Sequence, residues 1–320
     1  MRLLITGSRG FLGGSIGRFA TQNGYEILGI DRLPQPQSGW PGKYIAKDAT
    51  QSDLSTIVRD FRPDVLFHAA GPASVGASFR APIDDFQKSI VTWSNVLESV
   101  RRSKLDPLVI FPSSAAVYGN PAKLPVREDA VVAPISPYGF HKAACELLAR
   151  EYSECFGLNI VTCRFFSIFG PAQRRLLIWE LYHQFIGAES TVWLDGSGKE
   201  SRDYLAINDA AAALFQLIYK LRQRRPNGHR AICNYQVINI ASGEDIKIFK
   251  VAQKVGEILA SKKPIRCRGN ERRGEPRHWR ADISRLRSFI PSWNSKPLAL
   301  SLLECLAAWQ GGHDIFAAYL

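Results

Sequence analysis

The chain has 320 residues, 46% of them hydrophobic, and a formal net charge of +12 at pH 7. It is long enough to bury a large core and to form one domain with a smaller lobe. No apolar run approaches the ~20 residues of a membrane span. The first predicted strand starts at Met1 and leaves no room for a signal peptide, so we expect a cytoplasmic protein.

The cysteines argue against a disulfide framework and against a metal site. They are scattered, with no C-x-x-C pair and no paired ligand spacing, at Cys145, Cys155, Cys163, Cys233, Cys267 and Cys305. We expect free or buried thiols in a reducing compartment and no bound metal.

The N-terminal segment predicts a strand followed at once by a glycine-rich turn. Residues 2 to 6 have the pattern of a short buried strand, and helical apolar spacing resumes at Phe11. Between them, Gly7, Gly10 and Gly13 let the backbone turn tightly and bring its N–H groups, with the positive end of the next helix, against a pyrophosphate. Such glycines alone could form only a tight turn, but a second strand over residues 25 to 30 and an acidic residue follow in the expected order.

The acidic residue is Asp31. It falls near the ~20 residues expected after the turn, where a carboxylate accepts hydrogen bonds from ribose hydroxyls. Asp31 would repel a 2′-phosphate and therefore favours NAD. Arg9 in the turn and Arg32 directly after Asp31 could neutralise such a phosphate, so NADP stays an alternative.

Strand-like runs alternate with helical periods through about residue 165. This alternation predicts an α/β fold in which a parallel sheet is covered by helices on both faces. A further helix is expected from Asn208 to about Leu221, followed by a surface insertion over residues 222 to 234. The predicted strands are residues 2–6, 25–30, 43–46, 64–68, 107–112 and 159–164, and the predicted helices lie near 10–22, 51–61, 84–103 and 137–156.

A tyrosine and a lysine four residues apart indicate the chemistry. Tyr138 and Lys142 lie in a predicted helix, where positions four apart share a face, so the ammonium can lie beside the phenol and favour its ionised form. Without such a neighbour a phenol is a poor base at neutral pH. In isolation the pair would be a packing aromatic and a solvated lysine. After a dinucleotide-binding turn it indicates hydride chemistry.

In this order, the motifs resemble those of the extended short-chain dehydrogenase/reductase family, in its NAD-dependent epimerase/dehydratase branch, which acts on nucleotide sugars. The resemblance covers nearly the whole chain and also rests on residues 64–71 (DVLFHAAG), 113–119 (SSAAVYG), 164–171 (RFFSIFGP) and 196–204 (GSGKESRDY). It implies a Rossmann-type doubly wound parallel sheet with a smaller, discontinuous substrate lobe. The expected division is 1–166 plus about 204–232 for the dinucleotide domain, and about 167–203 plus 233–320 for the lobe.

The resemblance implies three catalytic residues. Ser114 lies four residues before Tyr118, where the family places its catalytic serine or threonine, and its hydroxyl would bond the reacting sugar oxygen. Tyr138 would take or return the proton of that oxygen, while Lys142 holds the phenolate and the ribose. The implied cofactor-binding residues are Gly7, Arg9, Gly10, Phe11, Leu12, Gly13, Asp31, Arg32, Asp48, Ala69, Ala70, Gly71, Tyr138 and Lys142.

Three polar residues near this set are expected to be structural. Ser113 precedes the catalytic serine, and His68 and His141 lie at a strand end and on a helix, where histidines more often pack or face solvent. All three are therefore left out of the mechanism.

The residues that follow Ser114 separate the possible activities. Family members that remove water from the sugar have an Asp-Glu pair there, because elimination needs a further acid and base, whereas this chain has Ala115 and Ala116. A methyl group transfers no proton, so a 4,6-dehydratase is disfavoured and the segment resembles the 4-epimerases. A ketoreductase would also need no carboxylates and stays the alternative.

The substrate side of the resemblance combines matches with departures. Ser167 and Ser89 stand where the family usually has asparagines, and both can still hydrogen-bond with shorter reach. Arg202 and Arg272 match arginines that commonly approach the diphosphate, whose oxygens suit a guanidinium fork. The implied substrate-binding residues are therefore Ser114, Ser167, Arg202 and Arg272, while the base and the sugar stay open.

Three expectations concern self-association, nucleic-acid binding and a noncatalytic role. The resemblance implies a homodimer through the helices near 84–103 and 137–156. The basic stretch over residues 262–280 suggests nucleic acid, but no recognition-helix, zinc-finger or aromatic-basic RNA motif accompanies it, so we expect none to bind. A noncatalytic dinucleotide sensor is disfavoured because the catalytic set is intact. The candidate dimer residues, which could equally pack inside the monomer, are Val91, Val96, Leu97, Ala143, Leu147 and Leu148.

Overall fold

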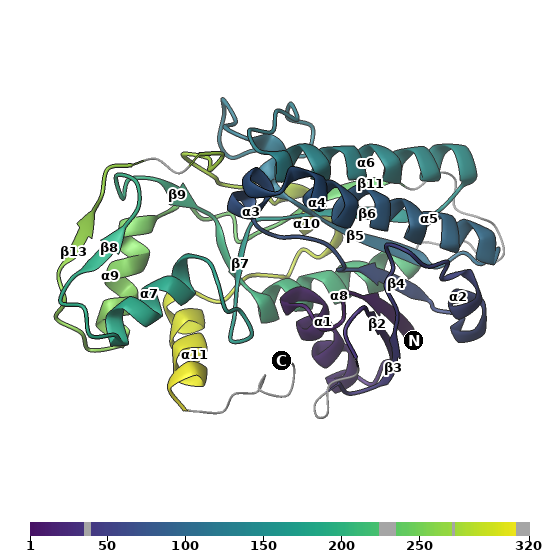
Figure 1. Cartoon of the computed structure of the whole chain (residues 1–320), viewed down its shortest axis with the longest axis horizontal. Coiled ribbons are helices and arrows are strands. Elements are labelled where there is room, and N and C mark those ends of the chain that lie inside the picture. The colour runs from purple at the N-terminus through teal and green to yellow at the C-terminus, as the bar shows by residue number, and fades with distance from the viewer. Residues whose placement is uncertain (35–39, 224–234, 271–272, 312–320) are drawn as a thin grey trace.

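The computed structural model describes residues 1–34, 40–223, 235–270 and 273–311. Its largest element is a parallel sheet with the strand order β11-β6-β5-β4-β1-β2-β3 (Figure 1). The order reverses between β1 and β4, which is the switch point of a Rossmann sheet, so the predicted fold class is confirmed. The strands are β1 (Arg2–Thr6), β2 (Glu26–Asp31), β3 (Lys43–Ala46), β4 (Val65–His68), β5 (Leu108–Ser114), β6 (Ile160–Phe165) and β11 (Gln236–Ile240).

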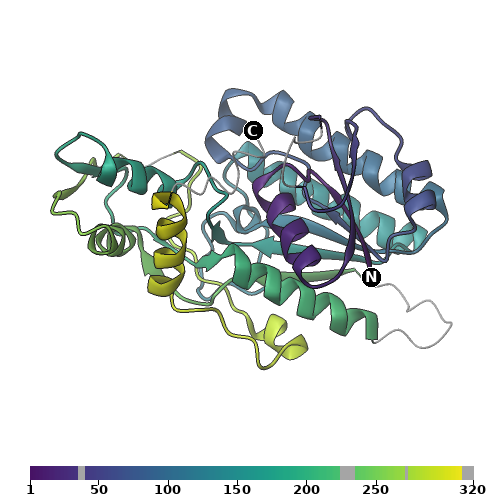
Figure 2. The same cartoon turned by 90° about the horizontal axis from the view of Figure 1, so that it is seen from below.

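Helices cover both faces of the sheet, as predicted. Along β1, Leu3 and Ile5 pack into the core that faces α1 (Phe11–Gln22) and α8 (Ile207–Gln223), whereas Leu4 packs into the core on the other side. This alternation follows from the two-residue period of a strand. Figure 2 shows α1 and α8 together on one face. The opposite face carries α2 (Ser55–Phe61), α5 (Thr92–Ser103) and α6 (Pro137–Phe156).

Two local predictions differ from the structure. The helix expected over residues 84–103 is three pieces, α4 (Pro82–Phe86), a π-helical turn (Gln87–Val91) and α5, with a separate short helix α3 (Val75–Arg80) before them. Strand β11 was not predicted, and it lies in the stretch that the sequence assigned to the substrate lobe. It nevertheless forms the edge of the main sheet, because its partner is β6, some seventy residues earlier in the chain. The predicted insertion falls mostly on residues 224–234, outside the described ranges.

A third apolar core belongs to the smaller lobe, on the left in Figure 1. It is built by α7 (Leu177–Ile186), α9 (Ile248–Ile258) and α11 (Leu298–Gln310), with three two-stranded pairs around them. The pairs join distant stretches of chain: β7 (Ser167–Phe169) with β10 (Tyr204–Ala206), β8 (Val192–Leu194) with β13 (Ile265–Cys267), and β9 (Ser201–Arg202) with β12 (Ile246–Lys247). Within the described ranges, no helix has the length and apolarity needed to cross a membrane.

Candidate active site

The glycine turn between β1 and α1 packs too closely for any side chain. Gly7 has φ +69°, and a Cβ there would lie 2.4 Å from the backbone nitrogen of Ala70. A Cβ on Gly13 would lie 2.3 Å from the carbonyl oxygen of Gly7. No side chain caps α1, which begins at Phe11, so its first N–H groups are left for a ligand. The residues present therefore fit the pyrophosphate of a dinucleotide.

We expect Gly13→Ala to weaken NAD binding about tenfold or more, because overpacking of this kind costs about 1–3 kcal/mol and each 1.4 kcal/mol is a factor of ten. Calorimetric titration with NAD measures the change. The control is Gly76→Ala in α3, where a Cβ would come no closer than 3.7 Å to the end of the Arg80 side chain. Equal affinities in the two variants would show that the close packing is irrelevant to the cofactor.

Asp31 ends β2 beside the glycine turn. Its carboxylate accepts hydrogen bonds from the backbone N–H groups of Arg9, at 3.0 Å, and Leu33, at 3.2 Å. The Arg9 guanidinium donates to the carbonyl of Pro34 at 2.9 Å, and Arg32 is exposed. A carboxylate therefore lies where the sequence predicts contact with the ribose, which favours NAD over its 2′-phosphorylated form.

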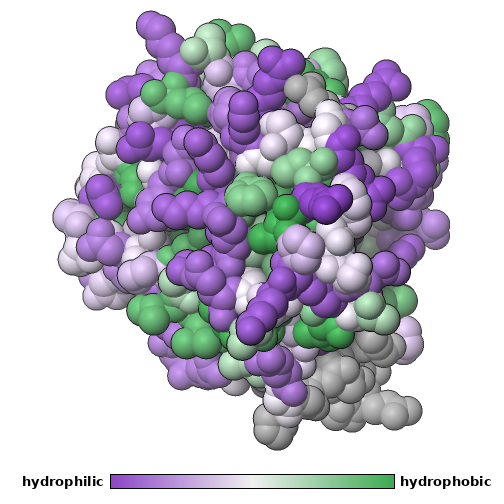
Figure 3. Space-filling view, turned by 90° about the vertical axis from the view of Figure 1, so that its left-hand side faces the viewer, coloured by the Kyte–Doolittle hydropathy of each residue, from purple (hydrophilic) through white to green (hydrophobic). Residues whose placement is uncertain are grey.

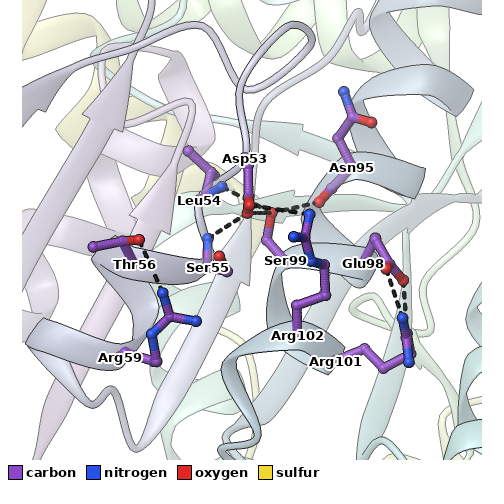
Figure 4. Close-up of polar contacts among 10 residues, drawn as sticks. All are labelled: Asp53, Leu54, Ser55, Thr56, Arg59, Asn95, Glu98, Ser99, Arg101 and Arg102. Carbon is purple, nitrogen blue, oxygen red and sulfur yellow. Dashed lines mark hydrogen bonds and ion pairs between the residues drawn. The ribbon is translucent and has the colours of Figure 1, made fainter.

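The loop that carries Asp48 is held against α5. Asp48 accepts a hydrogen bond from the N–H of Thr50 at 2.8 Å, and Asn95 on α5 donates to the carbonyl of Thr50 at 2.5 Å. Further along, Ser99 accepts from the N–H of Leu54, and Asp53 lies 3.2 Å from Arg102 (Figure 4). This set of contacts fixes the loop at the carboxyl end of β3, on the cofactor side of the sheet.

The three predicted catalytic residues come from β5 and α6. Ser114 is the last residue of β5, and Tyr138 and Lys142 lie in the first turns of α6. The Lys142 ammonium donates to the carbonyl of Pro112 at 2.9 Å and lies 5.8 Å from the centre of the Tyr138 ring. The lysine is thus anchored to β5 and held beside the tyrosine, as the four-residue spacing predicts.

The start of α6 packs directly on the turn that follows Ser114. Ser136 caps the helix by accepting a hydrogen bond from the N–H of Gly139 at 3.1 Å, and Pro137 occupies its first position. A Cβ on Gly139 would lie 2.7 Å from the carbonyl oxygen of Ala116. The absence of a side chain there lets the helix and the serine turn meet.

The three residues expected to be structural all have protein partners. The hydroxyl of Ser113 lies 2.5 Å from Glu146, and His141 lies 2.5 Å from Asp85 on α4. His68 bonds the hydroxyl of Thr6 at 2.8 Å inside the core. Burial, with a smaller contribution from the Lys142 charge, lowers the pKa of His68 to about 3, so this ring is neutral at pH 7.

Of the implied substrate-binding residues, Arg202 lies on β9 and Ser167 on β7. Arg202 is 7% exposed, donates to the carbonyl of Ser201 at 2.9 Å and lies 3.4 Å from Glu275. Ser167 is half-buried on β7, whose backbone bonds that of Asp203 at 2.9 Å. Arg272 lies outside the described residues.

Sequence reasoning missed the role of Asp203, which directly follows Arg202 in the chain. This fully buried carboxylate accepts hydrogen bonds from the N–H groups of Ser242, Gly243 and Ala281 and from the hydroxyl of Ser242. Burial raises the pKa of Asp203 to about 6, against these donors, which lower it. Its position directly after Arg202 in the motif was the available signal, but its partners lie about forty and eighty residues away.

Comparison with known proteins identifies the family of this chain. Residues 3–241 match the NAD dependent epimerase/dehydratase family. The chain belongs to this family. A UDP-glucuronate 4-epimerase of Thermodesulfobacterium geofontis is 27% identical over 302 residues, which are 90% of this chain and 89% of that protein.

Solved structures of family members agree over almost the full length. The UDP-N-acetylglucosamine 4-epimerase of Methanobrevibacter ruminantium, in complex with UDP-N-acetylmuramic acid, has a TM-score of 0.83 at 27% identity and pairs 97% of this chain with 98% of its own. The UDP-glucuronic acid 4-epimerase of Bacillus cereus, in complex with UDP-glucuronic acid and NAD, has a TM-score of 0.84 at 25% identity, covering 97% and 99%. The epimerase/dehydratase fold therefore extends through both parts of this chain.

Proposed function

We propose that this chain is an NAD-dependent nucleotide-sugar 4-epimerase. Its glycine turn and Asp31 fit NAD. Ser114 is the last residue of β5, and Lys142, which lies beside the Tyr138 ring, bonds Pro112 of the same strand. The three relatives reported above carry the names of UDP-sugar 4-epimerases. UDP-glucose, UDP-glucuronic acid and UDP-N-acetylglucosamine are therefore the first substrates to test.

In this proposal the protein residues move one proton in each direction. The Ser114 hydroxyl orients the sugar oxygen at C4, and Tyr138 takes its proton while the Lys142 ammonium stabilises the phenolate. NAD, when bound, supplies the acceptor for the C4 hydride and later returns it. Between the two steps the 4-keto sugar rotates in the site, so that the hydride returns to the opposite face of C4. Tyr138 then gives the proton back to the C4 oxygen, and no net redox change results.

The observation that most directly favours epimerisation over elimination of water is the apolar turn after Ser114. Ala115 and Ala116 are 0% and 6% exposed and begin a 3-10 turn. The backbone N–H of Ala116 donates to the Ser114 hydroxyl at 3.1 Å. Neither residue can donate or accept a proton. The tyrosine is left as the proton carrier, which suffices for epimerisation but not for elimination of water.

To distinguish an epimerase from a ketoreductase, the purified protein is incubated with each UDP-, GDP- and dTDP-sugar. Product stereochemistry and nicotinamide absorbance are followed together. A new C4 epimer without net absorbance change supports the proposal. Steady oxidation of NADPH with a 4-keto sugar would overturn it in favour of the ketoreductase.

We expect Arg202→Ala to weaken nucleotide-sugar binding about 10- to 100-fold more than NAD binding, since a charged hydrogen bond contributes about 1.5–3 kcal/mol. The guanidinium lies beside Glu275, with which the diphosphate would compete. Calorimetry separates the two ligands. The control is Arg266→Ala, an exposed arginine on β13 of the same lobe. If both variants bind nucleotide sugars like the parent, Arg202 is only a structural residue.

We also propose a division of the chain in which the substrate lobe takes residues from about 167 to 203 and those that follow β11, except for residues 279–293, which pack into the main core. The support is the third apolar core, whose residues come from these two stretches with a contribution from β10. The dinucleotide domain then keeps β11 with the rest of its sheet.

We propose that the protein forms a homodimer through the outer surface of α4 and α6. The exposed apolar residues of this surface differ partly from those that the sequence suggested. Val96 and Leu97 are fully buried inside the monomer, whereas Leu147 on α6 is 67% exposed. Other exposed apolar residues of α4 and α6 are Ile83, Phe86, Phe140 and Phe156. Helices α5 and α6 lie side by side on this face of the sheet (Figure 1), so two copies would join as a four-helix interface.

We expect light scattering at micromolar concentration to give the mass of a dimer for the parent and of a monomer for Leu147→Glu, because a buried unpaired charge opposes association. Leu300→Glu on α11, where the side chain is 52% exposed, is the control and should stay dimeric. A monomeric parent would contradict the proposed dimer.

The absence of a nucleic-acid partner remains part of the proposal. Figure 3 shows the end of the smaller lobe, where hydrophilic side chains alternate with isolated apolar ones. On this lobe Arg268 lies 3.7 Å from Asp195 and over the ring of Trp193, so its charge is partly balanced by a protein partner. Salt-dependent binding to DNA or RNA would contradict the proposal.

A further inference from the structure

A buried carboxylate on the catalytic helix contacts two neighbouring strands. Glu146 is 6% exposed and lies one turn beyond Lys142 on α6. Its carboxylate accepts hydrogen bonds from the hydroxyl of Ser113 on β5, at 2.5 Å, and from the guanidinium of Arg164 on β6, at 3.0 and 2.7 Å. One side chain therefore ties together three elements.

The contacts of Arg164 extend this set towards the serine turn. Arg164 is 4% exposed, donates to the carbonyl of Glu128 at 3.0 Å and lies 4.7 Å from the centre of the Tyr118 ring. The hydroxyl of Tyr118 lies 2.7 Å from Asn239 on β11. The 3-10 turn that begins after Ser114 and ends at Tyr118 is thus held at its far end by the same guanidinium.

Two members of this set, Ser113 and Glu146, are close chain neighbours of catalytic candidates. Ser113 precedes Ser114 on β5, where successive side chains point to opposite faces, so holding one orients the other. Glu146 and Lys142 share a face of α6 and contact adjacent residues of β5, since Lys142 donates to the carbonyl of Pro112 at 2.9 Å. The two contacts together fix how far along β5 the helix lies.

A contribution to protein stability alone does not explain the buried contacts among Ser113, Glu146 and Arg164. Apolar residues of similar volume often replace a buried ion pair without loss of stability, whereas a pair with specific geometry can select one arrangement. We propose that Ser113, Glu146 and Arg164 are positioning residues that hold Ser114 at its working distance from Tyr138 and Lys142. This inference rests on the proposed function.

The test removes a single hydroxyl. In Ser113→Ala the ion pair stays, and the contact between β5 and Glu146 is lost. The matched control is Ser153→Ala on the same helix, where the side chain is 1% exposed and its hydroxyl has no hydrogen-bond partner among the described residues. Thermal unfolding and NAD titration establish that both variants are folded and bind cofactor.

We expect Ser113→Ala to keep the parent KM and NAD affinity and to lose kcat about 10- to 100-fold, because small misplacements of reacting groups can cost about 10²-fold. Ser153→Ala should keep the parent kcat and KM. A Ser113→Ala enzyme with the parent kcat would overturn the inference, as would an equal loss in Ser153→Ala.

The inference can also be tested if no nucleotide sugar is turned over, which would refute the proposed function. Hydrogen–deuterium exchange of residues 113–118 and 137–142, measured with NAD bound, follows the packing of the serine turn on α6 without any substrate. Faster exchange in both segments of Ser113→Ala, and not of Ser153→Ala, supports the positioning role. Identical exchange in the two variants would refute it.

Discussion

Tyr138→Phe should fold and bind NAD like the parent but lose about 10²- to 10⁴-fold in kcat, the usual contribution of a positioned acid–base group. The change removes one hydroxyl and keeps the ring, which is 9% exposed and packs in the main core. Lys142→Met should lose activity as well, because it removes the ammonium that lies over the tyrosine ring and bonds Pro112.

The control for this prediction is Tyr152→Phe, which removes the other tyrosine hydroxyl of α6. That hydroxyl lies 3.4 Å from Glu98 on the neighbouring helix α5. Steady-state kinetics at saturating substrate, with NAD affinity measured separately, distinguishes the two changes. Parent rates in Tyr138→Phe would remove the tyrosine from the mechanism and favour a noncatalytic dinucleotide sensor.

Arg164→Met should lower the free energy of unfolding by about 3–5 kcal/mol, because it leaves the Glu146 carboxylate buried without its cation. The side chains of this pair are 5% and 8% exposed and meet at 2.7 Å. Urea denaturation measures the change. Breaking the exposed pair Arg150–Glu154 on the same helix, whose side chains are 60% and 49% exposed, should cost less than about 1 kcal/mol.

Combining Arg164→Met with Glu146→Leu should recover most of that stability, since neither charge is then left buried. Turnover should stay low in the double variant, because the contact between Ser113 on β5 and Glu146 on α6 is gone. A double variant with both parent stability and parent kcat would show that the ion pair has no part in catalysis. A single variant as stable as the parent would show that the pair is not effectively buried.

Local sequence patterns predicted much of the dinucleotide domain. The strand, glycine turn, helix and Asp31 follow one another within about thirty residues, and α1 begins at Phe11 as the apolar spacing predicts. The predicted helix over 137–156 matches α6, whose cap at Ser136 and proline at its first position are sequence signals. Other features escaped local patterns, such as the π-helical turn before α5 and the edge strand β11, whose partner is far away in the chain.

The sequence by itself therefore determined the α/β class, the glycine turn and the shared face of Tyr138 and Lys142, because each depends on backbone geometry over a few residues. Only the tertiary structure decided that Ser113 and Arg164 meet on Glu146, that Asp203 holds residues 242, 243 and 281, and that Val96 and Leu97 turn inward. Those contacts depend on strand order and on which helix covers which face. They join residues that are distant in the chain, so no local period encodes them.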